Sequence, residues 1–154
     1  MTPKHIEAFD TTVQTTNAWL REIGDALGIA NRRHAYLALR GTLHALRDFL
    51  PLDESAQLAA QLPMLVRGLY YEGWNPSAAP DPERTPERFL RRVDQEMARA
   101  MRGEACPIAA EEAVRAVLRV LAEHVSAGEL EQARQTLPER VRLFWPADSL
   151  VERR

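Results

Sequence analysis

The chain has 154 residues, of which 45% are hydrophobic and 27% are charged, a composition typical of a soluble globular protein. Its formal net charge of −2 argues against non-specific nucleic-acid binding as the main task, because neutralising phosphates requires a positive surface. No apolar run approaches the roughly 18 residues of a membrane span, and the first residues lack a signal-peptide pattern. The single Cys106 excludes an internal disulfide. We therefore expect a cytoplasmic protein that does not act at a membrane.

The first half of the chain has helical apolar spacing almost throughout. The apolar residues of the first predicted helix recur at steps of three and four and are expected to face the core: Phe9, Val13, Leu20, Ile23 and Leu27. Gly28 is expected to end this helix. Further helices are predicted from about 33 to 49, from about 53 to 62 with Asp53 as N-cap, and from Pro63 at N1 to Gly73.

A proline-rich segment, Asn75–Pro86, follows and holds four of the ten prolines, which predicts a linker. Thr85 and Pro86 then open a predicted helix that extends to about Met101. The next helices are expected over about 109–124, then from the capping box at Ser126 up to about 137, and in a short last helix that Pro146 ends. No segment alternates with a period of two, so the predicted fold class is all-α.

The second half also repeats the first at an offset of 75 residues. Between Arg40–Arg67 and Arg115–Arg142, nine of 28 positions are identical without a gap. Such a repeat predicts architecture strongly and chemistry weakly. We expect a single domain over 1–154, with repeat 1 at 9–74, a linker at 75–86, repeat 2 at 87–146 and a short tail at 147–154. Two four-helix units would pack with pseudo-twofold symmetry around one shared core, because each unit alone exposes an apolar flank.

Charges of the same sign recur at equivalent positions of the two repeats, namely Arg40/Arg115, Asp48/Glu123, Glu54/Glu129 and Arg67/Arg142. We interpret some of them as members of buried or half-buried ion pairs that determine how the helices dock, with a twin active site as the alternative. In particular, Arg67 is predicted to pair with an acid of the second or third helix.

Motifs for catalysis, cofactors and metals are lacking. The four histidines have no carboxylate or second histidine at the spacing of a helical metal motif. His44 lies four residues from both Arg40 and Asp48, which allows an ion-paired surface patch, although a solvated or capping histidine is the simpler interpretation. Cys106 has no assignable base and is predicted to be structural. We therefore assign no catalytic, cofactor-binding or metal-binding residue.

The segment Tyr71–Trp74 is the clearest difference between the repeats, because Tyr71, Glu72 and Trp74 have no counterparts in the second. Two aromatic residues and an acid beside a linker could line a groove or anchor a partner, whereas the simpler interpretation has Trp74 fastening the linker to the core. The candidate residues for partner or ligand binding are Arg67, Tyr71, Glu72, Trp74 and His44.

The stretch Leu62–Trp74 (LPMLVRGLYYEGW), together with Phe9–Leu27 and the second-copy segment from Leu137-Pro138 to Trp145-Pro146, resembles the bacterial family catalogued as domain of unknown function 2267 (DUF2267). The resemblance covers about Phe9–Pro146. It implies an all-helical protein of duplicated units, and it implies no activity, substrate or catalytic residue.

Three functions remain open at this point. The first is a non-catalytic helical module that binds an unknown protein partner or forms a small homo-oligomer. The second is a ligand-binding protein or enzyme with a pocket between the repeats, using Arg67, Tyr71, Glu72 and His44. Nucleic-acid binding is the third and least favoured; the residues that would support it are Arg32, Arg33, Arg88, Arg91 and Arg92.

Overall fold

The computed structural model describes residues 4–146, so the predicted tail at 147–154 lies outside the described residues. Within 4–146 the chain forms helices and no strand, which confirms the all-α prediction. The elements are α1 (Glu7–Leu27), α2 (Arg32–Phe49), α3 (Leu52–Ala60), α4 (Met64–Tyr71), the 3-10 helix η1 (Pro76–Ala78), α5 (Pro86–Ala100), α6 (Ala110–His124), α7 (Ala127–Thr136) and the 3-10 helix η2 (Val141–Phe144). No described helix is long and apolar enough to cross a membrane.

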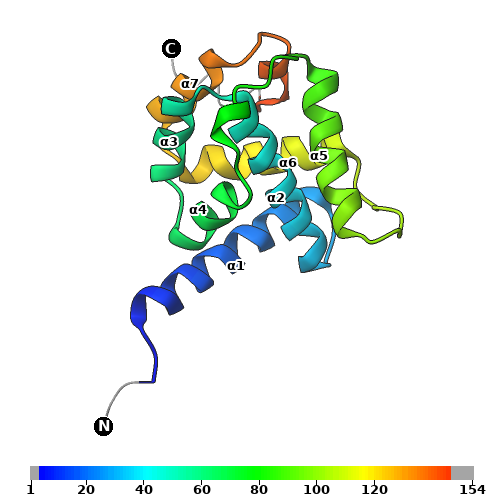
Figure 1. Cartoon of the computed structure of the whole chain (residues 1–154). Coiled ribbons are helices and arrows are strands. Elements are labelled where there is room, and N and C mark those ends of the chain that lie inside the picture. The colour runs from blue at the N-terminus through cyan, green and yellow to red at the C-terminus, as the bar shows by residue number, and fades with distance from the viewer. Residues whose placement is uncertain (1–3, 147–154) are drawn as a thin grey trace.

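Helix α2 lies at the centre of the fold, where α1, α4, α5 and α6 pack around it (Figure 1). Twelve of its 18 residues are buried, because it has no face turned wholly to solvent. Gly41 allows α5 to approach closely, since a Cβ at this position would lie 3.3 Å from the carbonyl oxygen of Val93. Burial on all sides also encloses polar side chains of α2, which must then find partners inside the protein.

The outer half of α1 projects beyond the rest of the molecule (Figure 1). From Thr16 onwards α1 is anchored, with Trp19 and Ile23 buried, whereas Phe9 and Val13 are exposed. The prediction that these two residues face the core is therefore wrong. The reason is length: a 21-residue helix spans about 30 Å, while α4 beside it has eight residues and spans about 12 Å.

Several predicted helix ends are confirmed by their caps. Gly28 ends α1 in a left-handed conformation (φ 69°). The Oγ1 of Thr85 accepts from the backbone N–H of Arg88 at the start of α5, and the Oγ of Ser126 accepts from that of Glu129 at the start of α7. Local side-chain chemistry was sufficient to locate these ends.

Other predicted ends are wrong. Asp53 lies inside the first turn of α3 and makes no cap hydrogen bond, and that helix ends at Ala60 rather than at 62. Pro63 is the N-cap of α4, with an extended ψ of 152°, rather than its first helical residue. The predicted last helix is the short 3-10 helix η2.

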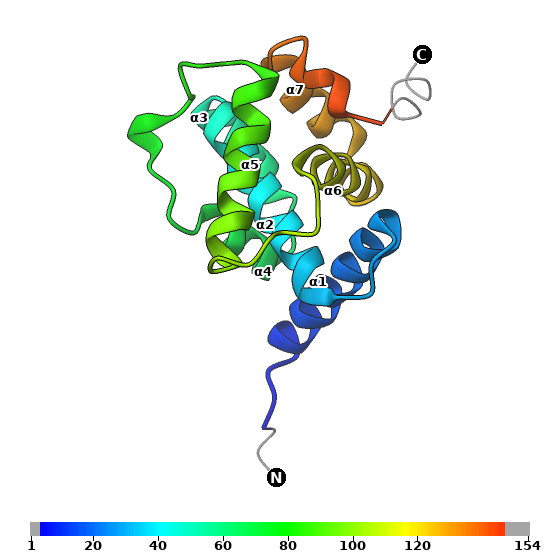
Figure 2. The ribbon, with the colours of Figure 1, turned by 90° about the vertical axis from the view of Figure 1, so that its right-hand side faces the viewer.

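The linker at 75–86 arcs away from the helices and returns to them at its end (Figure 2). Arg84 fastens it by donating to the carbonyl oxygens of Phe49 (2.8 Å) and Thr136 (2.7 Å), which lie at the carboxyl ends of α2 and α7. The N–H of Asp81 adds a bond of 2.7 Å to the carbonyl of Asp48. The linker therefore contributes hydrogen bonds between elements that are distant in sequence.

Candidate functional site

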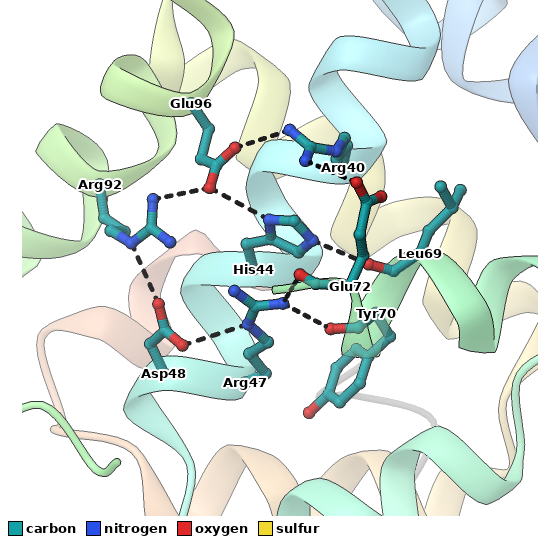
Figure 3. A network of polar contacts seen from close by, with 9 residues as sticks. All are labelled: Arg40, His44, Arg47, Asp48, Leu69, Tyr70, Glu72, Arg92 and Glu96. Carbon is teal, nitrogen blue, oxygen red and sulfur yellow. Dashed lines mark hydrogen bonds and ion pairs between the residues drawn. The ribbon is translucent and has the colours of Figure 1, made fainter. Parts of the chain in front are cut away.

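A group of charged side chains lies where α2, α5 and the end of α4 meet (Figure 3). We call it the His44 network, and its members are Arg40, His44, Arg47, Asp48, Glu72, Arg92 and Glu96. Four of these residues are on α2, two are on α5, and Glu72 follows α4. It contains two of the predicted candidates, His44 and Glu72. The spacing of Arg40, His44 and Asp48 indicated part of this group, whereas nothing local connected Arg47, Glu72, Arg92 and Glu96 to it.

His44 is at the centre of the network and is only 1% exposed. Its Nδ1 lies 3.1 Å from Oε1 of Glu96, and its Nε2 lies 2.8 Å from the carbonyl oxygen of Leu69. A carboxylate and a carbonyl only accept, so both contacts are hydrogen bonds when both ring nitrogens carry protons. His44 is thus buried rather than solvated, and its Nε2 contacts a carbonyl oxygen in the last turn of α4, as a capping histidine does.

Glu96 is the carboxylate on which three side chains converge. It accepts from Nη1 of Arg40 (2.8 Å) and from Nη1 of Arg92 (2.9 Å), and its Oε1 lies 3.1 Å from Nδ1 of His44. The hydrogen bonds with His44 and Arg92 outweigh the opposing effect of burial and lower the pKa of Glu96 to about 2. The predicted patch of Arg40, His44 and Asp48 is therefore part of a larger and more buried group, in which the acid that contacts His44 is Glu96 of α5.

Arg47 extends the network to the end of α4. It is buried, and its Nη1 donates to the carbonyl oxygens of Tyr70 (3.0 Å) and Glu72 (2.5 Å), while its Nε donates to Asp48 (3.2 Å). Such carbonyls at a helix carboxyl end lack intrahelical partners and favour a cation. Asp48 also accepts from Nε of Arg92 (3.0 Å), which links α2 to α5 a second time.

The seven residues satisfy one another rather than present a free reactive group. A general base needs an available lone pair within reach of a substrate proton. Both ring nitrogens of His44 are engaged, and Glu96 already accepts three hydrogen bonds. Through these bonds the network links α4 and α5 to α2.

Tyr71 and Trp74, two further candidates, pack against each other with ring centroids 5.4 Å apart. Tyr71 also meets Tyr70 edge-on, and both candidates are half-buried. Glu72 lies between Tyr71 and Trp74 in the sequence and accepts from Nη2 of Arg40 through its Oε1 (3.3 Å). This bond connects the segment Tyr71–Trp74 to the His44 network. Their role in partner or ligand binding remains a prediction.

Arg67, the remaining candidate, lies apart from the network and forms no ion pair with an acid of residues 4–146. Its guanidinium donates to the carbonyl oxygens of Ala59 (3.0 Å), Ala60 (3.3 Å) and Leu62 (3.0 Å). The predicted ion pair with an acid of the second or third helix is therefore wrong. The carbonyls where α3 ends accept from the arginine instead.

Glu54 and Glu129, one of the pairs of equivalent acids, face each other where α3 packs on α7. Glu54 is buried, and burial, followed by its contact with Glu129, raises its pKa to about 7. Burial and the neighbouring acid both disfavour the ionised form, so Glu54 keeps its proton to a higher pH than usual. These two acids are therefore not among the recurring charges that form ion pairs with cations in residues 4–146.

One group of side chains has atoms placed as metal ligands would be. Ligand atoms of Glu22, Glu123 and His124 lie within 4.8 Å of one another, a spacing that a divalent cation could bridge. In the structure His124 bonds to Glu22 at 2.6 Å and stacks on Trp19. Glu22 is 102 residues from His124, so no local spacing in the sequence indicates this group.

The fold and the site together define an all-α protein whose central helix is surrounded by other helices and held by buried charges. The chain belongs to the DUF2267 family, described as an uncharacterized conserved protein, whose model matches residues 16–144. This confirms the resemblance seen in the sequence. A search of curated proteins finds no match. The matched segment begins at Thr16, the point where α1 enters the body of the molecule.

Proposed function

We propose that the protein is a non-catalytic helical module that acts by protein–protein contact, with a second copy of the chain as its partner. The proposed surface is the outer half of α1. It lies ahead of the segment that the family model matches, so the proposal concerns this chain rather than the family.

The apolar stripe of α1 carries this proposal. Leu20 and Ile23 bury one face of the helix, and Val13, Phe9 and Ile6 continue apolar spacing toward the amino end. Those three side chains are 47%, 56% and 59% exposed. Large apolar side chains gathered on one exposed helix face are typical of an interaction surface, because water disfavours them.

Helix α4 adds a second part to the surface. Met64 and Leu65 at its start are also exposed, and the N–H of Leu65 bonds to Oγ1 of Thr12 at 2.9 Å, which places them next to α1. A shallow hollow of about 500 Å³ lies between the two helices; its lining consists of Glu7, Ala8, Thr11, Thr12, Thr15, Pro63 and Met64.

A second copy suits this surface because it offers an apolar ridge on α1 and a hollow beside it on the same molecule. In a twofold dimer each surface contacts its own copy, so the ridge of each chain can enter the hollow of the other. The packing of α1 on α1 then buries the stripe that one chain alone leaves in water.

Sedimentation equilibrium of the full chain over a range of concentrations tests the proposal. We expect the wild type to dimerise and the variant Phe9→Ser/Val13→Ser to be monomeric with an unchanged melting temperature. The matched control is Leu52→Ser/Leu143→Ser, which removes two exposed apolar side chains elsewhere and should still dimerise. A wild type that is monomeric at about 100 μM, a weak-dimer range, or a dimeric Phe9→Ser/Val13→Ser variant refutes the proposal.

We further infer that the module consists of two related units with pseudo-twofold symmetry around a shared core. Support comes from equivalent bonds: Arg67 donates to the carbonyls of Ala60 and Leu62, and Arg142 to those of Gln135 and Leu137, each shifted by 75 residues. Glu54 and Glu129, which are equivalent residues of the two units, also meet where α3 contacts α7. This supports the pseudo-twofold symmetry, because a twofold axis brings equivalent positions together.

A further inference from the structure

A hollow of about 340 Å³ lies between the first half of α2 and the carboxyl end of α5, and arginine dominates its lining. The two helices run antiparallel, since Arg33 of α2 bonds to the carbonyl of Ala100 while Asp48 bonds to Arg92. Arginines from both helices therefore converge on one place; the charged residues lining the hollow are Arg33, Arg40, Glu72, Arg99 and Arg102.

The balance of charge at this hollow is opposite to that of the chain. Four guanidinium groups stand against one carboxylate, an excess of three positive charges in a protein whose formal net charge is −2. Such local concentration of one sign raises the local concentration of counter-ions. The excess is large enough for a ligand with two negative charges.

Not all four arginines are already engaged. Arg40 is held by Glu96 (2.8 Å) and Glu72 (3.3 Å), and Arg33 gives one N–H to a carbonyl. Arg99 and Arg102 are exposed, and within residues 4–146 their side chains have neither an ion pair nor a hydrogen bond. Their donors are therefore available to a ligand.

The side of the hollow formed by α2 is ordered by contacts of its own. Leu37 is buried, and the position of Arg40 is determined by Glu96 of the His44 network. Tyr36 adds a half-buried aromatic ring to the lining. On the other side, Arg102 has a positive φ of 52°, so the chain leaves the helical path at this residue.

We propose that this hollow binds a small soluble ligand that carries a phosphate group with two negative charges. Guanidinium groups bind such groups through paired N–H donors, with a geometry that an ammonium cannot match. The competing explanation is that the arginines only offset the helix dipole at the carboxyl end of α5. That explanation accounts for the bond from Arg33 to Ala100, and it predicts no ligand.

Titration calorimetry of the full chain at low salt tests the proposal, with inorganic phosphate and pyrophosphate as probes, because salt screens such contacts. We expect saturable binding by the wild type and a loss of about tenfold or more in affinity in Arg99→Ala/Arg102→Ala. The control Arg21→Ala/Arg91→Ala removes two other exposed arginines and should bind like the wild type. Substitution at exposed positions leaves folding intact, which melting temperatures without ligand verify.

Two results overturn the proposal. One is that Arg99→Ala/Arg102→Ala binds both probes as tightly as the wild type does, or that neither protein binds either probe. The other comes from a third probe, a single-stranded oligonucleotide: if it binds while phosphate and pyrophosphate do not, the arginines recognise a nucleic-acid backbone rather than a small ligand.

Discussion

Glu54 of α3 and Glu129 of α7 meet carboxyl to carboxyl at the contact between their helices, and they occupy equivalent positions in the two halves of the sequence. One oxygen of each is buried without a hydrogen-bond partner among the described residues, so neither carboxyl group is fully satisfied. A proton retained on Glu54 therefore favours the folded state.

The first prediction concerns stability between about pH 4.5 and about pH 7. The pKa of Glu54 rises from 4.5 to about 7 on folding, so in this range the folded state binds more protons than the unfolded state. The free energy of unfolding attributable to Glu54 should then fall as the pH rises through this window. Glu54→Gln should flatten this slope and stabilise the protein at about pH 8, as urea unfolding at several pH values would measure.

Glu139→Gln is the control, because Glu139 is an exposed glutamate in the segment after α7. It should retain the slope of the wild type. If Glu54→Gln and Glu139→Gln have the same dependence on pH, burial beside Glu129 does not raise the pKa of Glu54.

The second prediction concerns the opposite end of the pH scale. Folding lowers the pKa of Glu96 from 4.5 to about 2. The contribution of Glu96 to the free energy of unfolding is therefore fully present above about pH 4.5 and is lost as the pH falls through about 2. Glu96→Gln leaves Arg40, Arg92 and His44 without their carboxylate, and we expect a loss of about 3–5 kcal/mol in the free energy of unfolding near neutral pH.

Denaturant unfolding measures this loss, and Asp94→Asn, an exposed acid on the same helix, should change stability by less than about 0.5 kcal/mol. A similar small change for Glu96→Gln would show that the His44 network does not hold α5 on α2.

The third prediction tests whether Arg67 and Arg142 are equivalent. Each donates to carbonyls near the end of the preceding helix, so Arg67→Ala and Arg142→Ala should each cost about 1–3 kcal/mol, by similar amounts. Lysine should restore little, because it lacks the planar fork. Unequal losses in thermal unfolding, with Arg21→Ala as the exposed control, would contradict the proposed equivalence of the two units.

The sequence was sufficient for features that depend on neighbours along the chain. Thr85 and Ser126 cap the helices that they were predicted to cap, because an N-cap needs only an oxygen and the N–H groups that follow. Periodicity correctly indicated helices throughout, yet it misplaced Phe9 and Val13. A helical repeat shows which residues share a face and does not show whether another element covers that face.

The site was largely beyond prediction, because His44 and Glu96 are separated by 52 residues. The local spacing pointed to Asp48 instead, which lies four residues from His44 on the same helix. The spacing of Arg40, His44 and Asp48 on α2 indicated one half of this charged group, and that of Arg92 and Glu96, four residues apart on α5, could have indicated the other. Only the packing of α5 on α2 brings the two sets together.

The fourth prediction concerns the close approach that makes this packing possible. A side chain at Gly41 would meet the carbonyl oxygen of Val93 at 3.3 Å and its Cγ1 at 3.4 Å, whereas one at Gly68 of α4 would have no atom within 4 Å. Gly41→Val should therefore separate α2 from α5 and cost about 1–3 kcal/mol. Gly68→Val is the matched control and should leave stability unchanged or raise it by a few tenths of a kcal/mol, roughly the gain in helix propensity.

Because the separation would also lengthen the bond between His44 and Glu96, the variant Gly41→Val should weaken the dependence of stability on acid pH that Glu96 causes. If Gly41→Val matches Gly68→Val in both measurements, the close contact of α2 with α5 is not what holds the His44 network together.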